Sequence, residues 1–132
     1  MRKNGFFAMM TRMRNITRWG LMRNNITENL TEHSYDTAVT AHALAVIGKE
    51  KFGKDIDPGQ IAAVALFHDA SEIITGDMPT PVKYNNPEIQ AAYKSIEHAA
   101  SQSLCGCYRR NCSPSTRCCS PLKQIILNCT AM

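Results

Sequence analysis

Apolar residues recur through residues 5–104 at the spacing of α-helices. Phe6, Met10 and Met13 follow an i, i+4, i+7 pattern, which predicts an amphipathic helix over residues 5–16. Similar patterns predict helices over 31–51, over 58–75 and from residue 87 to about 104. The expected inward-facing positions of the second and last of these helices are Ala38, Ala41, Ala45, Val46, Ile89, Tyr93, Ile96 and Ala100. No stretch alternates apolar and polar residues over the length of a strand, so the fold class is predicted to be all-α.

Helix boundaries are marked by capping residues. The run DPGQ at 57–60 combines a capping carboxylate, a proline at the first helical position and a glutamine where a capping box needs it. The run NPE at 86–88 repeats this arrangement before the last helix. Gly53 and Gly76 stand where helices are expected to end, since glycine accepts the backbone conformation found there.

Charged side chains interrupt the most apolar segment of the chain, residues 65–74. This segment predicts a buried helix, yet it contains His68, Asp69 and Glu72, which helical spacing places on one side. Burying such groups among aliphatic side chains is costly unless they are paired or bind a metal, and imidazole with carboxylate suits a divalent cation. The simpler alternative is a helix end with an exposed acid and a hydrogen-bonded histidine. Asp77, after the turn, adds one more carboxylate beside this group.

The charge of the chain is unevenly distributed. The net charge is +4, from 15 basic and 11 acidic residues. Residues 105–132 contain four of the basic residues and no acid, so residues 1–104 are balanced at 11 of each. No basic stripe remains in the main body, and no nucleic-acid partner is expected.

All six cysteines also lie in residues 105–132. A zinc module and a disulfide framework are the two functional alternatives, but the spacings contain no pair of CxxC elements. The basic start of the chain is followed by an apolar run, 6–10, that is too short for a secretory signal, and no segment approaches a membrane span. A cytoplasmic protein with reduced thiols is therefore expected.

Four motifs carry a resemblance to a known family. They are the pair Arg18-Trp19, the run TENLTEHS at 27–34, the pair His68-Asp69, and the segment EIITGDMPTPVK at 72–83. Over residues 6–104 the chain resembles the HD-domain phosphohydrolases, and among them the bacterial 5′-deoxynucleotidases, which dephosphorylate deoxynucleoside monophosphates. The resemblance implies an HD-domain helical bundle and a phosphomonoester hydrolase that uses a divalent cation such as Co²⁺, Mn²⁺ or Mg²⁺.

The resemblance also implies a metal site. Its ligands would be His33, His68 and Asp69, from two different helices. Two imidazoles and a carboxylate leave coordination positions open for water and a phosphate oxygen. His42 and His98 match no motif and are expected to be structural.

Further roles follow from the resemblance on the substrate side. Arg18 would hold the phosphate with its planar guanidinium, and Trp19 would crowd the ribose 2′ position and so favour deoxyribose. Glu72 would assist proton transfer near the reacting water, and Asp77 would contact the sugar or that water. The residue types alone also fit a surface ion pair for Arg18, a core position for Trp19 and a turn for Asp77.

The chain departs from the family pattern after Leu104. The family's metal site is completed by an aspartate from a later helix, whereas no aspartate follows Asp77 here. If residues 105–132 are back-translated with suitable codons and two nucleotides are dropped, one translation is amphipathic and similar to the family's continuation. The expected organisation is the N-terminal portion of an HD domain over 1–104 and an irregular, out-of-frame cysteine-rich tail over 105–132. The missing part would leave apolar helix faces and the tail thiols uncovered.

The favoured interpretation is a metal-dependent 5′-deoxynucleotidase whose activity in this form depends on the missing portion. The alternative is a non-catalytic HD-like module that binds nucleotides or another partner. Phosphate release with bound metal distinguishes the first from the second. The sequence does not determine the oligomeric state, and it is compatible with a homodimer.

Overall fold

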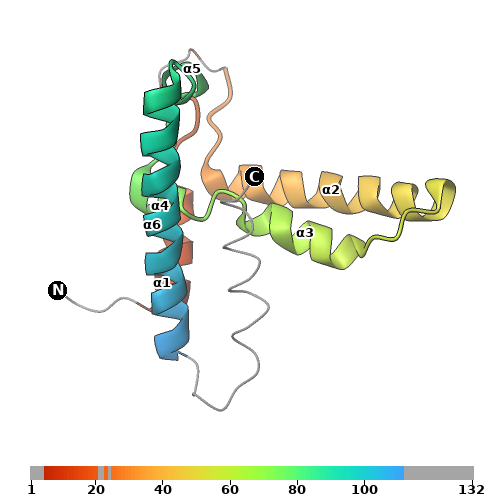
Figure 1. Cartoon of the computed structure of the whole chain (residues 1–132). Helices are drawn as coiled ribbons and strands as arrows, with labels where there is room; N and C mark the ends of the chain where they lie inside the picture. Colours follow the sequence, from red (N-terminus) through yellow and green to blue (C-terminus); the bar gives the residue numbers. More distant parts are fainter. Residues whose placement is uncertain (1–4, 21–22, 24, 112–132) are drawn as a thin grey trace.

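The computed structural model describes residues 5–20, 23 and 25–111 (Figure 1). Its helical elements in chain order are α1 (Phe6–Met10), the 3-10 helix η1 (Thr11–Asn15), α2 (Leu30–Phe52), α3 (Pro58–Phe67), α4 (Glu72–Thr75), α5 (Thr80–Lys83) and α6 (Pro87–Asn111). The predicted all-α class is confirmed. Within the described ranges, extended pairing is limited to an isolated antiparallel bridge between Thr17 and Asn29. The short helix α5 was not predicted.

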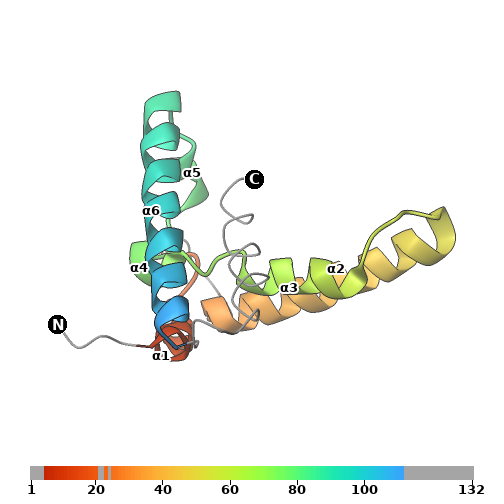
Figure 2. The ribbon, with the colours of Figure 1, turned by 60° about the horizontal axis from the view of Figure 1, so that its bottom comes forward.

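The helices form two arms that meet near the start of α2 (Figure 1 and Figure 2). In one arm α2 and α3 pack side by side, and in the other α1, α4 and α5 each pack along α6. The 3-10 helix η1 contacts both α2 and α4, so it joins the arms. The first turn of α2 therefore lies close to the turn that connects α3 with α4.

Local hydrogen bonds fix the ends of both helices in the first arm. The Asn29 side chain accepts from the backbone N–H groups of Thr31 and Glu32, and the Glu32 carboxylate accepts from the Asn29 N–H at 3.1 Å. This is a complete capping box, which satisfies donors that have no partner inside the helix. Asp57 caps α3 as predicted, and α2 ends at Gly53 with a left-handed φ of 60°.

A small core lies where the two arms meet. Its buried members are Met13, Leu30, Ala70, Ile73 and Leu104, which come from η1, α2, the α3–α4 turn, α4 and α6. Met9, Met10, Ile16 and Phe67 pack against them. Burial of each methylene group stabilises the fold by about 0.8 kcal/mol. The core thus holds the α3–α4 turn against the beginning of α2.

The predicted helix over 58–75, with its buried segment at 65–74, is wrong in two respects. It is broken, because α3 ends at Phe67 and residues 68–71 form a turn before α4. The segment 65–74 is also not buried in its first part, which belongs to α3, because no residue of α3 is fully buried and Leu66 is exposed. Burial begins at the turn, with Ala70 and Ile73. His68 and Asp69 therefore lie on a tightly packed turn and not on a continuous helix.

The predicted inward positions are only partly correct. Ala45, Tyr93 and Ala100 are buried, whereas Val46, Ile89 and Ile96 are exposed. Large exposed apolar side chains on α2 include Tyr35, Val39, Leu44, Ile47 and Phe52. The expectation that the helices leave apolar faces uncovered is confirmed for these side chains.

Helix α6 continues beyond the predicted boundary at residue 104. It extends to Asn111, and Leu104 and Cys105 are both buried, so residues 105–111 belong to the helical arm. The expected accessibility of the thiols is wrong for Cys105. Residues 112–132, with the remaining part of the predicted tail, lie outside the described residues. No described helix is both long and apolar enough to cross a membrane.

Candidate metal centre

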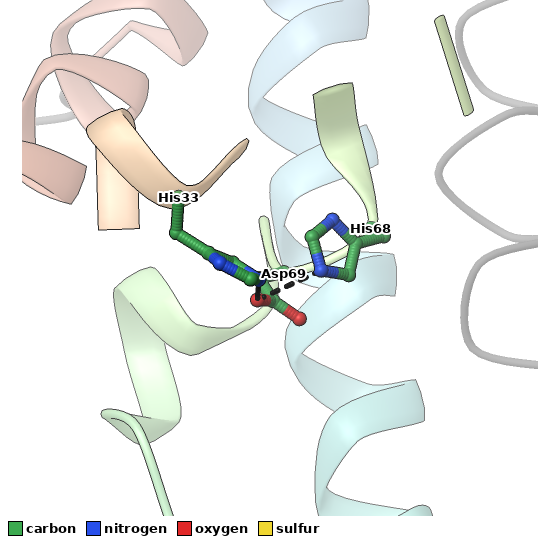
Figure 3. A group of neighbouring side chains, drawn as sticks. All are labelled: His33, His68 and Asp69. Atoms are coloured by element: carbon green, nitrogen blue, oxygen red, sulfur yellow. Dashed lines mark ion pairs between the residues drawn. The ribbon is translucent and has the colours of Figure 1, made fainter. Parts of the chain in front are cut away.

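His33, His68 and Asp69 converge at the junction of the two arms (Figure 3). His33 comes from the first turn of α2, which the capping box at Asn29 fixes in place. His68 and Asp69 come from the turn after α3, anchored by the buried Ala70. The structure thus brings together the three residues that the sequence proposed as metal ligands.

The donor atoms of these three side chains lie at the spacing of ligands around one cation. Asp69 Oδ2 is 3.0 Å from His68 Nε2 and 3.5 Å from His33 Nε2. All three donor atoms lie within 4.8 Å of one another. Ligands about 2.1 Å from a shared ion are separated by about 3.0 Å at right angles and about 3.4 Å in a tetrahedron. The donor set therefore fits a divalent cation.

A hydrogen bond orients the His68 imidazole, and a longer ion-pair contact lies beside the His33 imidazole. His68 Nδ1 lies 2.7 Å from the Ala65 carbonyl oxygen, so it carries the proton and donates, and Nε2 faces Asp69. His33 Nδ1 lies 3.8 Å from Glu28 Oε1, which leaves its Nε2 on the side of Asp69. Outer partners of this kind fix the orientation of imidazole ligands and increase their basicity.

The charges of the centre favour an ionised Asp69. Burial alone would raise the pKa of Asp69, but the hydrogen bond and charge of His68, followed by the charges of His33 and Arg18, outweigh it and hold the pKa below its usual value. The hydrogen bond to Asp69 raises the pKa of His68, whereas burial and the charge of Arg18 lower the pKa of His33. A carboxylate surrounded by three nitrogen groups is the electrostatic centre of the site.

Arg18 reaches the same carboxylate from the loop before α2. The Arg18 N–H donates to the Glu28 carbonyl at 2.9 Å, beside the Thr17–Asn29 bridge, and this pairing places Arg18 opposite Glu28. Its Nε donates to Glu28 Oε2 at 3.0 Å and its Nη1 to Asp69 Oδ2 at 3.3 Å. Arg18 is therefore part of the centre and not a separate surface ion pair.

Glu28 was not proposed as a site residue from the sequence. It contacts both Arg18 and His33 and so connects the segment before α2 to the candidate metal centre. Its place in the run at 27–34 was the available signal, but its partner Arg18 is ten residues away in the sequence.

Glu72 lies in an unusual environment at the start of α4. It is 6% exposed, and its Oε2 has no hydrogen-bond partner among the described residues. Burial raises the pKa of Glu72 from its usual 4.5 to about 8, and the charges of Asp69 and Asp77 contribute. A carboxyl group with a pKa near 8 can hold or release a proton close to neutral pH.

Trp19 and Asp77 lie at a separate cavity of about 240 Å³ next to Arg18. Its lining consists of Arg18, Trp19 and the segment 77–82. The Trp19 N–H donates to Asp77 Oδ2 at 3.0 Å, and the Arg18 guanidinium carbon lies 5.5 Å from the centre of the indole ring. Trp19 is 45% exposed, so it is not a core residue.

A second polar group joins α5 to α6, directly after the segment that lines this cavity. Lys83 Nζ donates to Glu97 Oε1 at 2.6 Å and lies 4.7 Å from the centre of the Tyr93 ring. Burial alone would lower the pKa of Lys83, but the hydrogen bond and charge of Glu97 outweigh it and raise the pKa. Tyr93 was expected only as an inward-facing residue of the last helix, and no local pattern connects Tyr93 or Glu97 to Lys83.

The two histidines outside the motifs do not join the centre. His42 is exposed in an apolar hollow between α2 and α3 that also includes Tyr35 and Leu66. His98 is exposed on α6, where its Nε2 lies 2.9 Å from Gln102 Nε2. Both are therefore surface residues, and His42 provides a control position for metal binding.

Comparison with known proteins places this constellation in a family. Residues 5–115 match the family described as 5′-deoxynucleotidase YfbR-like. The 5′-deoxynucleotidase of Vibrio cholerae is 53% identical over 104 residues, which cover 79% of this chain and 54% of the relative. The 5′-deoxynucleotidase YfbR of Shigella boydii is 52% identical over 104 residues (79% and 52%), and the Photorhabdus laumondii 5′-deoxynucleotidase is 54% identical over 99 residues (75% and 50%). The chain spans about half the length of the curated relatives it matches. It belongs to the YfbR-like 5′-deoxynucleotidase family.

Proposed function

We propose that this protein hydrolyses the phosphate ester of deoxynucleoside 5′-monophosphates with the help of a divalent cation. The observation that carries the proposal is the convergence of His33, His68 and Asp69, with Arg18 on the same carboxylate. The relatives that share this part of the chain are named 5′-deoxynucleotidases, which supports the choice of substrate.

His33, His68 and Asp69 would hold the cation, with Co²⁺, Mn²⁺ and Mg²⁺ as candidates. When bound, such a cation polarises a phosphoryl oxygen and lowers the pKa of water at its open positions. The chain itself contributes geometry: the Ala65 carbonyl holds the His68 imidazole through a hydrogen bond, and the Glu28 carboxylate lies 3.8 Å from Nδ1 of His33.

Arg18 would bind the phosphate beside this centre. Its guanidinium already lies within 3.3 Å of Asp69, so a phosphate placed near the metal ligands is within its reach. A guanidinium binds phosphate oxygens with two parallel hydrogen bonds, which fixes orientation as well as charge. Glu72, buried and with a pKa near 8, would accept the proton of the reacting water or return one to the leaving oxygen.

Trp19 and Asp77 would form the sugar side of the site. Both line the cavity adjoining Arg18, so a nucleotide with its phosphate at Arg18 would have its sugar near them. The indole would crowd a 2′-hydroxyl, and Asp77 would act on the sugar or the reacting water. A cytoplasmic location, a homodimer and the absence of a nucleic-acid partner stay predictions of the sequence.

The test is phosphate release from deoxyadenosine 5′-monophosphate with Co²⁺, Mn²⁺ or Mg²⁺. It compares the 132-residue chain with a chimaera in which residues 1–104 are followed by the C-terminal half of the Vibrio cholerae relative. We expect metal-dependent release in the chimaera, loss of release in its His68→Ala variant, and retention in its His42→Ala variant. Nucleotide binding without release in both proteins would contradict the proposal and favour the non-catalytic module.

A further inference from the structure

Trp19 has a backbone conformation that its side chain disfavours. Its φ is 61°, and it is the only non-glycine residue with positive φ among those the structure describes. In this left-handed region the Cβ atom approaches the following carbonyl oxygen, which makes it rare for bulky residues. Such a conformation persists only where surrounding contacts impose it.

Two hydrogen bonds to residues elsewhere in the chain hold Trp19 in this conformation. The residue before Trp19 is held because the Arg18 N–H donates to the Glu28 carbonyl. Trp19 itself is held because its own N–H donates to Asp77 Oδ2 at 3.0 Å, across 58 positions of sequence. The Asp77 contact is therefore the direct restraint on the disfavoured residue.

The segment that presents Asp77 is itself held in place. Gly76 has a φ of 75°, which only glycine adopts readily, and this conformation turns the chain directly after α4. Pro79 then precedes α5, whose Lys83 is tied to Glu97 of α6. Asp77 is thus presented from a constrained loop, as a positioning group requires.

We propose that Asp77 is the positioning residue for Trp19, and that through this hydrogen bond it sets which sugar the cavity accepts. The selectivity part of this inference rests on the proposed function. With Asp77 Oδ2 engaged by the Trp19 N–H, the carboxylate holds the indole at the wall of the cavity. Without that acceptor, Trp19 relaxes to negative φ, the indole moves away and the cavity opens.

The hydrogen bond can be tested without any turnover, because Trp19 is the only tryptophan of the chain. Its fluorescence emission and its quenching by acrylamide are measured in the 132-residue protein and in two variants. Asp77→Ala removes the acceptor, and we expect a shifted emission maximum and stronger quenching. Asp77→Asn keeps an oxygen that can accept from the N–H, and we expect the emission of the unmodified protein. Asp36→Ala, an exposed acid on α2, is the matched control, and circular dichroism confirms equal helix content.

The selectivity is tested on whichever form of the protein releases phosphate. The ratio of kcat/KM for deoxyadenosine over adenosine 5′-monophosphate should fall about tenfold in Asp77→Ala, roughly 1.4 kcal/mol, and persist in Asp77→Asn. If Asp77 instead transferred a proton in the reaction, Asp77→Asn would lose kcat as severely as Asp77→Ala. The ratio of kcat/KM for the two nucleotides would then stay unchanged in both variants.

These experiments distinguish failure of the positioning role of Asp77 from failure of the proposed function. Unchanged Trp19 fluorescence in Asp77→Ala, or equal changes in Asp77→Ala and Asp77→Asn, would overturn the positioning role whatever the activity. The expected fluorescence with no phosphate release from any form would overturn the proposed function and leave the hydrogen bond between Asp77 and Trp19 established.

Discussion

Replacing Glu72 by Gln should stabilise the metal-free protein at alkaline pH. Glu72 is almost fully buried, one of its oxygens lacks a described partner, and burial raises its pKa from 4.5 to about 8. The folded chain therefore binds a proton that the unfolded chain releases between these two pH values. Stability from this group is fully present below about pH 4.5 and is lost as the pH rises toward 8.

The expected gain in the free energy of unfolding is calculated from the shift in the pKa of Glu72. A change from 4.5 to about 8, at about 1.36 kcal/mol per pKa unit, corresponds to at most about 5 kcal/mol. Local rearrangement around an ionised Glu72 reduces this figure, so we expect about 2–4 kcal/mol. Because Gln is neutral at every pH, Glu72→Gln should exceed the unmodified protein by less than about 1 kcal/mol near pH 5 and by the full 2–4 kcal/mol at pH 9.

Urea unfolding at pH 5, 7 and 9 in the presence of a chelator measures this difference. Glu88→Gln, which neutralises an exposed carboxylate at the start of α6, is the matched control and should show no comparable gain. A Glu72→Gln variant that is no more stable than the unmodified protein at pH 9 would refute the buried, protonated state of Glu72.

Further predictions concern the phosphate, the sugar and the supporting ion pair. Arg18→Lys in the chimaera should lose about 1–3 kcal/mol in kcat/KM for deoxyadenosine 5′-monophosphate, since an ammonium cannot form the paired hydrogen bonds; unchanged kinetics would remove Arg18 from phosphate binding. Trp19→Ala should narrow the preference for deoxyribose, measured as the ratio of kcat/KM values, and an unaltered ratio would refute the crowding role. Glu97→Gln should reduce the free energy of unfolding in urea by about 1–3 kcal/mol, because Lys83 would keep a half-buried charge without its anion. Equal stability would show that the ion pair contributes nothing net.

Helix starts could be predicted from the sequence because their causes are local. Asn86 accepts from the Ile89 N–H at 2.8 Å, and Asp57 accepts from Gly59 and Gln60, so each cap is contained within four residues. Burial was predicted less well, because it depends on which other helix is present. Ile96 fits the inward stripe of α6 by spacing, yet no described element covers it.

The break after Phe67 also has a non-local cause. Periodicity favours a continuous helix through His68 and Asp69, since both are compatible with helical spacing. In the structure the turn is held by the burial of Ala70 against Leu30 and Leu104, which come from other helices. The break places Asp69 where His33 of α2 can reach it.

The candidate site also combines features that local sequence predicts with features that depend on contacts between distant residues. The sequence motifs predicted His33, His68 and Asp69 as candidate metal ligands, and these three side chains lie together in the structure. The role of Glu28 could not be predicted, because its contact with Arg18 spans ten positions of the sequence and no local pattern indicates it. The contact between Asp77 and Trp19 spans 58 positions and depends on two positive φ angles, at Trp19 and Gly76.

Direct binding of Co²⁺ to the 132-residue chain tests the central claim, that His33, His68 and Asp69 form a metal site. The visible absorption of Co²⁺ reports its ligands, and nitrogen and oxygen donors are distinguished from thiolates by the absence of intense sulfur-to-metal charge-transfer bands. We expect saturation at about one Co²⁺ per chain, with no thiolate bands. Binding should be lost in His68→Ala and Asp69→Ala and retained in His42→Ala. Binding that survives both of the first two substitutions, or that shows thiolate bands from the cysteine-rich segment, would contradict the claim.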